Sequence, residues 1–488
     1  MALLRARRRA QGAASAILSK WVPGPRRPAA MLIRDRVTPA QLLIVSFAAF
    51  IGVGTLGFRF LPGLYTDQGL GWTDSLFMAT SAVCVTGLSV VDTATYFTGF
   101  GQAWLLILMQ TGGLGLLTLT SLVMLGTGRR LSLRHSDLVA GAGTGVPVVD
   151  VRRLVKLVFI ATFTIEALGA ALLYISWLGG MGTAGAAWPA VFHAVSAFCN
   201  AGFSTLAEGL GGQAVRPVVL GTIMALTTLG ALGFLTISEL ASRAPGRWRY
   251  RQRRQRVPLS LHTKLVLAAT STLIVLTLVT FAYFEWANTL QGMPLRDKLA
   301  HSAFAAVISR TAGFGSVDFG AVAAPTSLLM MIMMFIGGGP ASTAGGIKVT
   351  TAALIFSLMI TRLRGRDRVS AWNRTVPDET IGRAVGLTVL ASSVLVAALF
   401  LLVAVELPMQ TGTAEQVAFI HLAFEATSAL STGGLSMNAT DSLGSAGRLI
   451  AVALMFTGRV GLLSIGAAIA LHGNRERFRY AYEDVAIG

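Results

Sequence analysis

Four short segments of the chain each carry a central glycine at the end of a short apolar stretch. The glycines are separated by 115, 111 and 121 residues, and this near-constant spacing indicates an internal fourfold repeat. A glycine permits positive φ and leaves no side chain in the way, so successive backbone carbonyls can point toward one axis. Carbonyls so arranged can replace the water shell of a monovalent cation. The segments are Val85-Thr86-Gly87-Leu88-Ser89, Asn200-Ala201-Gly202-Phe203-Ser204, Thr311-Ala312-Gly313-Phe314-Gly315 and Thr432-Gly433-Gly434-Leu435-Ser436.

The stretches before these glycines also resemble one another. A phenylalanine stands ten residues before the glycine in three repeats and one place off in repeat 3, and a serine stands six residues before it in repeats 1, 2 and 4. We therefore expect a short re-entrant helix before each segment, with its negative C-terminal end favouring a cation. The matching residues are Phe77, Phe192, Phe304 and Phe424, then Ser81, Ser196 and Ser428, with Val307 in repeat 3.

The composition indicates an integral membrane protein. Of 488 residues, 53% are hydrophobic and 13% are charged, against about 25% charged residues in soluble domains. The mean hydropathy is +0.66. The expected fold is all-α, with four repeats of helix, re-entrant pore helix, filter and helix around a central pore, giving eight spans and four half-helices.

The expected elements follow from the apolar stretches of about 20 residues and from shorter ones that cannot cross. The spans are Ala40–Phe60, Ala103–Leu125, Leu154–Leu178, Val218–Leu240, Lys264–Trp286, Ser327–Thr361, Ile381–Val405 and Leu449–Leu471, and the half-helices are Ser75–Cys84, Val191–Cys199, Ala300–Ser309 and Val417–Leu430. The repeats occupy residues 39–135, 150–242, 263–362 and 380–472, flanked by a basic extension (1–38), a basic linker (243–262) and a tail (473–488).

The net charge of +18 is distributed as the positive-inside rule requires. Of 40 Lys and Arg residues, 32 lie in residues 1–38, 128–156, 241–264, 361–383 and 471–488, which are the termini and alternate connections. We expect both termini and these connections on the cytoplasmic side of the plasma membrane. The distribution of charge indicates membrane topology rather than nucleic-acid binding. Attraction to anionic lipid is a secondary role of these residues.

The third return span is interrupted by five glycines and a proline within ten residues. Such a stretch cannot form a continuous helix, and irregular backbone at membrane depth is tolerated where it is buried in protein or lines a water-filled cavity. Hydroxyls and free carbonyls give the segment a polar lining, which favours a functional loop over a simple kink. The segment is Gly337, Gly338, Gly339, Pro340, Ala341, Ser342, Thr343, Ala344, Gly345 and Gly346.

Ionisable residues inside apolar stretches are functional candidates. Arg459 can face the pore and tune cation entry, or can pair with Glu239 or Glu425. Arg310, just after the third half-helix, is expected to support the filter through hydrogen bonds to carbonyls. Glu425 can pair with Arg310 or stabilise the filter, and Lys348 can extend to the cytoplasmic edge.

Two cysteines, Cys84 and Cys199, each stand three residues before a filter glycine. Matching positions near the axis favour small packing residues over a disulfide. The six histidines show no metal-ligand spacing, so no enzyme activity and no cofactor in this chain are expected.

From Ala40 to Gly488 the chain resembles the membrane subunit of the Trk/Ktr/HKT superfamily of potassium transporters. The resemblance rests on the four filter segments, Gln110-Thr111-Gly112-Gly113, Ser309-Arg310-Thr311-Ala312-Gly313 and Arg459. One span precedes the first filter, and the ending Tyr482-Glu483-Asp484-Val485-Ala486-Ile487-Gly488 is similar to the Ktr type. The resemblance implies potassium uptake, a homodimer with one pore per subunit, and a cytosolic nucleotide-binding ring that gates it.

The resemblance also assigns site residues, and it implies that the glycine-rich segment 337–346 is an intramembrane gating loop beneath the filter. It implies K+ bound by the carbonyls of Gly87, Gly202, Gly313 and Gly434, and Gly87 in place of serine implies potassium rather than sodium. Any nucleotide belongs to the regulatory partner, and sodium dependence stays open. The expected filter residues are Thr86, Gly87, Leu88, Asn200, Ala201, Gly202, Phe203, Thr311, Ala312, Gly313, Phe314, Thr432, Gly433, Gly434 and Leu435.

Two other functions compete with a channel-like pore. A cation-coupled secondary transporter would use the broken third-repeat helix as its substrate site, and inverted repeats would favour it. The four repeats here all start and end on one side. A membrane scaffold for a cytosolic regulator would need the basic connections and not the filter glycines.

Overall fold

The computed structural model describes residues 39–126, 151–207, 209–211, 217–241, 243, 259–407 and 413–461. The predicted N-terminal extension, the C-terminal tail and most of the basic linker lie outside these residues, as does the end of the last span. The regular secondary structure of the described residues is helical apart from one antiparallel hairpin, β1 (Ser370–Ala371) and β2 (Arg374–Thr375), and an isolated bridge between Tyr65 and Phe97.

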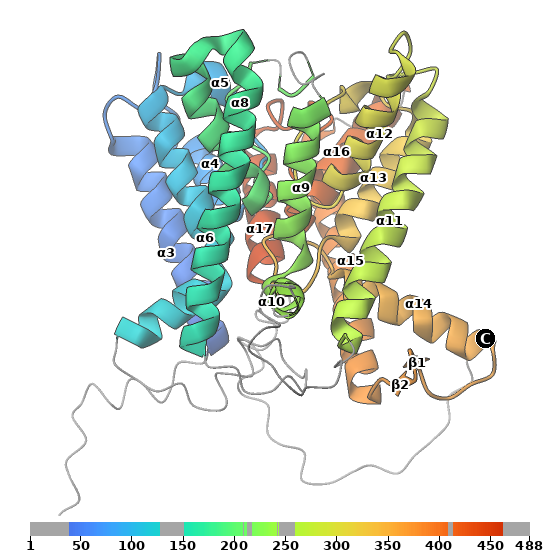
Figure 1. The fold of residues 1–488 in the computed structure, drawn as a ribbon. Coiled ribbons are helices and arrows are strands. Elements are labelled where there is room, and N and C mark those ends of the chain that lie inside the picture. Colours follow the sequence, from blue (N-terminus) through green and yellow to red (C-terminus); the bar gives the residue numbers. More distant parts are fainter. Residues whose placement is uncertain are drawn as a thin grey trace, which may run out of the picture.

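The helices form an upright assembly in which segments distant in sequence stand side by side (Figure 1). The first half of the chain supplies α3 (Pro39–Phe60), α4 (Trp72–Val83), α5 (Thr93–Tyr96), α6 (Gly99–Gly126), α8 (Val151–Cys199), α9 (Pro217–Leu232) and α10 (Phe234–Ala241). The second half supplies α11 (Leu261–Glu285), α12 (Leu295–Ile308), η2 (Phe319–Ala321), α13 (Ala324–Ile336), α14 (Val349–Leu363), α15 (Asp378–Glu406), α16 (Thr413–Ser431) and α17 (Ser445–Val460).

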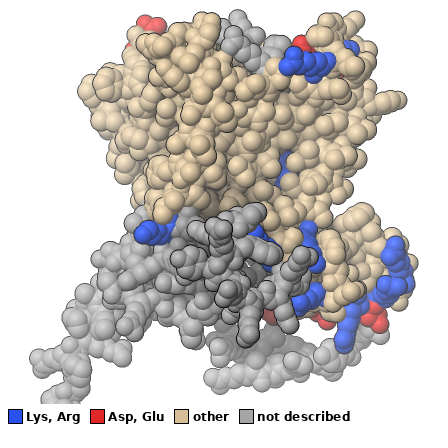
Figure 2. Space-filling view, in the orientation of Figure 1, with Lys and Arg blue, Asp and Glu red and all other residues tan. Residues whose placement is uncertain are grey.

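Four of these helices are long and apolar enough to cross a membrane, within the described part of the chain, and the bent pair α9 and α10 makes a fifth. The outward face of α15 is apolar: Val389, Val396 and Phe400 are 60%, 66% and 72% exposed. Side chains of this kind suit a lipid environment, because a soluble protein rarely exposes such a continuous apolar face. Figure 2 agrees: the middle of the face shown carries little charge, and Lys and Arg lie toward the lower end, with a smaller group at the upper right. The protein is a multi-pass membrane protein.

Two predicted elements differ from the structure. The span Leu154–Leu178 and the half-helix Val191–Cys199 are joined into one helical stretch, α8, with a kink at Gly182, where φ is 71° and ψ is 175°. The predicted return span Val218–Leu240 is wrong as a continuous helix: it breaks at Gly233 and turns by 101°. Gly233 has φ of 85°, and a Cβ there would lie 2.2 Å from the carbonyl oxygen of Pro340, so the neighbouring loop requires both the break and the glycine.

The protein core surrounds the four half-helices. The phenylalanines Phe77, Phe192, Phe304 and Phe424 each have 0% exposure. Cys84 and Cys199 are buried free thiols, so the packing interpretation of the cysteines is confirmed. The predicted half-helices correspond to α4, the second part of α8, α12 and α16, and the predicted interruption of the third return span corresponds to the gap between α13 and α14.

Candidate functional site

The four glycine segments share one backbone conformation. In each, the glycine and the residue two places before it have positive φ, which few L-residues adopt outside such turns. The segments therefore repeat in structure as well as in sequence. The φ values are 56° and 94° for Val85 and Gly87, 59° and 73° for Asn200 and Gly202, 65° and 76° for Thr311 and Gly313, and 50° and 77° for Thr432 and Gly434.

The four glycines meet one another. A Cβ built on Gly202 would lie 2.6 Å from the Cα of Gly313, and one on Gly313 would lie 3.2 Å from the Cα of Gly434. These contacts join repeat 2 to repeat 3 and repeat 3 to repeat 4, at a spacing that leaves no room for a side chain.

The other two contacts close the circle. A Cβ on Gly87 would lie 2.3 Å from the carbonyl oxygen of Ala201, and one on Gly434 would lie 2.1 Å from the carbonyl oxygen of Thr86. Each repeat thus touches the next in chain order, and the last touches the first. We call this closed arrangement of the four segments the glycine ring.

Serine side chains fix two of the segments on their half-helices. Ser81 donates to the carbonyl of Leu88 at 2.6 Å and accepts from the backbone N–H of Gly87 at 3.1 Å. Ser196 donates to the carbonyl of Phe203 at 2.9 Å. Two of the three serines identified from spacing therefore hold the chain just beyond the glycine, whereas the buried hydroxyl of Ser428 in repeat 4 has no hydrogen-bond partner among the described residues. Repeat 3, with Val307 at this position, lacks such a hydroxyl.

Each half-helix ends at the glycine ring. The helices α4, α8, α12 and α16 end at Val83, Cys199, Ile308 and Ser431, between three and five residues before their glycines. The C-terminal end of a helix carries a partial negative charge, and four such ends converge here. The arrangement favours a cation at the ring without any carboxylate in its wall.

The segment 337–346 contacts the ring segments, and we call it the gating loop after the role predicted for it from the sequence. The amide of Asn200 donates to Thr343 Oγ1 at 2.9 Å, and Gly345 N donates to Thr311 Oγ1 at 3.1 Å. A Cβ on Gly345 would lie 2.0 Å from Thr432 Oγ1. In three repeats, therefore, the residue two places before the filter glycine contacts the gating loop.

Arg459 also contacts the gating loop. It donates to the carbonyl of Thr343 and, at 2.7 Å, to the carbonyl of Gly112 in repeat 1. Its expected alternative, an ion pair with Glu239 or Glu425, is wrong. The guanidinium instead joins α17, α6 and the loop. Its role in tuning cation entry stays a prediction.

The side chains of Arg310 and Lys348 also donate hydrogen bonds to the gating loop. Arg310, 4% exposed, donates to the carbonyl of Gly337 at 3.1 and 3.3 Å, so it supports the start of the gating loop rather than a filter carbonyl as expected. Lys348 donates to the carbonyl of Ala344 at 2.7 Å. Its expected extension to the cytoplasmic edge is wrong, because free carbonyls of the irregular backbone bind the ammonium nearby.

Glu425 lies on the other side of the ring. Its carboxylate accepts hydrogen bonds from Ser436, from Met437 N at 3.2 Å and from Thr440 Oγ1 at 2.7 Å. It does not pair with Arg310. The carboxylate holds the chain that follows the fourth filter segment, which is the filter-stabilising alternative considered from sequence.

Sequence reasoning missed how the return helices approach the ring. A Cβ on Gly112, Gly230 or Gly458 would lie 1.9 to 2.0 Å from a half-helix carbonyl four residues before the filter glycine. Three return helices thus pack by backbone against three half-helices. The signal was present as glycines in apolar spans, of which the sequence analysis used only Gly112, as part of a motif shared with the family. The carbonyls belong to Val83, Phe198 and Leu430.

Comparisons with known proteins identify the family of the chain. The family model of TrkH, a cation transport protein, matches residues 25–478. The chain is 35% identical over 455 residues to the Ktr system potassium uptake protein B of Bacillus subtilis, covering 93% of this chain and 97% of that one. It is 36% identical over 409 residues to the protein of the same name in Vibrio alginolyticus, covering 83% and 86%.

Two further similarities are informative. The potassium/sodium uptake protein NtpJ of Enterococcus hirae is 31% identical over 460 residues, covering 93% of this chain and 98% of that one. The crystal structure of the potassium transporter TrkH from Vibrio parahaemolyticus superimposes with a TM-score of 0.71 at 17% identity, over 93% of this chain and 88% of that one. The latter supports the fold.

Proposed function

The chain belongs to the TrkH family of cation transport proteins, and from this premise we propose that it takes up potassium through a channel-like pore along the axis of the glycine ring. The family match also confirms that the protein is a transporter rather than an enzyme. The observation that carries the proposal is the closed circle of four positive-φ glycines, each in backbone contact with the next repeat.

The ring can select a cation by replacing its water. A potassium ion on the axis exchanges hydration oxygens for backbone carbonyls of the four filter segments. The converging half-helix ends lower the electrostatic cost of that exchange. Carbonyls, being uncharged, also let the ion leave. K+ is therefore the substrate of the protein, bound at the carbonyls of Gly87, Gly202, Gly313 and Gly434.

The gating loop controls the path below the ring. It is held by donors from three directions: Asn200 of repeat 2, Arg310 of repeat 3 and Arg459 of repeat 4. These bonds all end on the loop, so releasing them loosens it. In this proposal a held loop blocks ions and a released loop lets them pass.

The regulation of the pore is part of the same proposal. The charge of the basic connections supports cytoplasmic termini, and two relatives are named as parts of a Ktr system, which implies further components. We propose a homodimer with one pore per chain, gated by a cytosolic nucleotide-binding ring. One relative carries sodium in its name, so sodium is tested beside potassium below.

The test is cation flux through the purified protein in liposomes, comparing K+, Rb+ and Na+. The wild type is compared with Gly434→Ser and with Gly386→Ala, whose site on α15 has nothing within 4 Å of an added Cβ. We expect potassium-preferring flux that loses its preference in Gly434→Ser and keeps it in Gly386→Ala. A folded Gly434→Ser variant with an unchanged preference contradicts the filter assignment.

A further inference from the structure

The gating loop is paired by backbone with the junction between α9 and α10. Three N–H···O=C bonds of 2.8 to 3.2 Å run between the loop and this junction, in both directions. The junction bends by 101° at Gly233, so α10 leaves α9 almost at a right angle and lies beneath it (Figure 1). The bonds are Gly339 N to Ala231 O, Thr343 N to Gly230 O and Phe234 N to Ala341 O.

This pairing couples the loop to the direction of α10. Phe234 is the first residue of α10, and its N–H is one of the three donors. Gly233 contributes no side chain that could brace the bend. A rotation of α10 about Gly233 would therefore move Phe234 away from Ala341 and weaken the pairing. Whatever fixes α10 also fixes this side of the gating loop.

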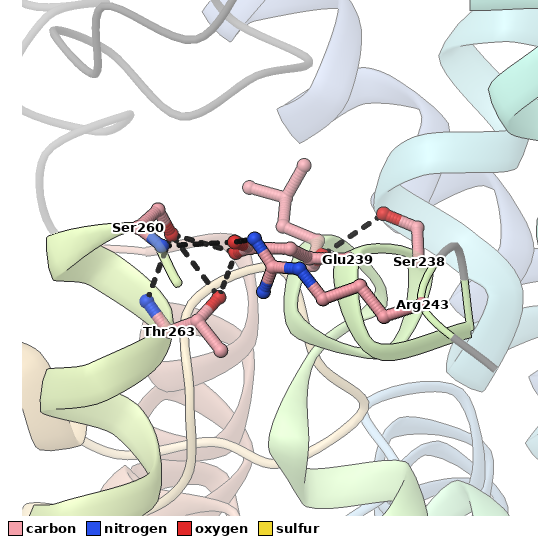
Figure 3. A network of polar contacts seen from close by, with 6 residues as sticks. Ser238, Glu239, Arg243, Ser260 and Thr263 are labelled. Carbon is pink, nitrogen blue, oxygen red and sulfur yellow. Dashed lines mark hydrogen bonds and ion pairs between the residues drawn. The ribbon is translucent and has the colours of Figure 1, made fainter. Parts of the chain in front are cut away.

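The far end of α10 is fastened to the start of α11 by one carboxylate (Figure 3). Glu239 accepts from Ser260 N at 2.8 Å, from Ser260 Oγ at 2.6 Å and from Thr263 Oγ1. Arg243 completes the cluster with an ion pair to Glu239 at 2.9 Å. We call these four residues the α10–α11 tie.

The tie is a specific contact rather than a surface ion pair. Ser260 is the N-cap of α11, and its hydroxyl also accepts from Thr263 N at 3.2 Å, so the carboxylate binds a residue that is itself held in place. The anion lies at a helix N-terminus, where negative charge is favoured. Hydrogen bonds to a charged group are stronger than neutral ones.

We propose that Glu239 and Ser260 are positioning residues for the gating loop, acting through α10. The carboxylate holds α10 against α11, α10 holds the junction at Gly233, and the junction holds the loop by its three backbone bonds. The tie therefore belongs to the closed state of the pore, and loosening it raises flux. This inference rests on the gating role proposed above.

The experiment measures potassium flux in liposomes without any cytosolic partner, for Glu239→Gln, Glu239→Lys and the double variant Glu239→Lys with Ser260→Asp. We expect both single variants to raise flux, by about tenfold for Glu239→Lys, since a charged network is replaced by repulsion from Arg243. The double variant restores a pair of opposite charge between the same positions. Its flux should return toward that of the wild type.

A matched control comes from an ion pair with no connection to the loop. Glu379 and Arg383 pair on exposed α15 at 2.5 Å, and Glu379→Gln should leave flux unchanged. A deletion of residues 338–344 is measured beside these variants, and size-exclusion profiles exclude misfolded preparations. Glu239→Gln changes only the charge and serves as the milder variant if Glu239→Lys does not fold.

The outcomes distinguish failure of the α10–α11 tie from failure of the proposed gating role. If the deletion raises flux while folded Glu239 variants match the wild type, the tie is overturned and the gate stands. If the deletion also leaves flux unchanged, the gating role itself is contradicted. A double variant that stays as active as Glu239→Lys overturns the pairing between positions 239 and 260, because the rise would then come from a general disturbance of α10.

Discussion

The glycine ring and the gating loop both depend on glycines with positive φ, but different contacts hold them in place. Both contain glycines with positive φ whose added Cβ atoms would collide with backbone, as at Gly202 in the ring and Gly337 in the loop. The ring glycines meet the corresponding segments of other repeats. The loop is instead bound by donors from outside it, such as Arg459 and Asn200.

In the function proposed above, this difference separates ion selection from gating. A ring closed by its own backbone contacts cannot open one segment without disturbing its neighbours, so its geometry suits a fixed set of carbonyls. A loop held by side chains on several helices can be released when those helices shift. In this proposal one chain carries a rigid part and a movable part in direct contact with each other.

The largest expected effect comes from breaking the ring. Gly202→Ala places a Cβ 2.6 Å from the Cα of Gly313, and gives a positive φ of 73° to a residue that tolerates it poorly. We expect the preference for potassium over sodium to be lost. Reversal potentials in a bi-ionic gradient measure this change.

The control for that variant lies in the same repeat. Gly221→Ala on α9 meets nothing within 4 Å and should keep the preference. If the folded Gly202→Ala protein selects potassium like the wild type, the ring does not hold the ion by its carbonyls. The proposed contrast between a rigid, selective ring and a movable loop is then wrong for the ring.

The second effect tests the movable part. Deleting residues 338–344 removes the loop backbone that accepts from Arg459, while the ring contacts between repeats remain. We expect higher potassium flux in the absence of a regulator, with the potassium preference retained. Flux into liposomes together with the reversal potential separates the two properties. A deletion variant with normal flux would favour the simple kink considered from the sequence.

The two regions also differ in how far the sequence predicts them. The ring is predictable because its glycines recur at one spacing with matching Phe and Ser positions, and the loop because Gly and Pro cannot continue a helix. The break at Gly233 was not predictable, because a single glycine in an apolar span is common. What forces it is Pro340, which is 107 residues away in sequence.

Side-chain partners were predicted least well. Arg459, Arg310 and Lys348 were recognised as intramembrane cations, but carboxylates, filter carbonyls or solvent were expected as their partners. The structure gives them carbonyls of the gating loop or of Gly112. A backbone carbonyl leaves no trace in the residue types, so sequence can identify a buried cation more readily than its acceptor.

The third effect tests one fastening of the loop. Arg459→Met keeps an unbranched side chain of similar length but removes the donors to Thr343 O and Gly112 O. Each bond from a charged donor is worth about 1.5 to 3 kcal/mol. We expect a rise in flux of about tenfold, smaller than that of the deletion because Asn200 and Arg310 still hold the loop.

The readout for this variant distinguishes two roles of the guanidinium. If Arg459 acts by holding the loop, the flux of Arg459→Lys should lie between that of the wild type and that of Arg459→Met, because an ammonium can donate to one of the two carbonyls. If its charge in the pore limits cation entry instead, Arg459→Lys should have the single-channel conductance of the wild type. Arg459→Met should then raise the single-channel conductance rather than the fraction of time that the channel is open. Single-channel recording in planar bilayers measures both quantities.

The smallest effect is expected for a glycine that belongs neither to the glycine ring nor to the gating loop. Gly386 lies on the exposed face of α15, and an added Cβ there meets nothing within 4 Å. Alanine favours helix over glycine by about 0.5 to 1 kcal/mol, so Gly386→Ala should raise thermal stability slightly and leave flux and selectivity unchanged. Thermal unfolding in detergent and liposome flux measure these properties. If Gly386→Ala altered selectivity as strongly as Gly202→Ala, contact with a neighbouring repeat would not be what distinguishes the ring glycines from the others in this chain.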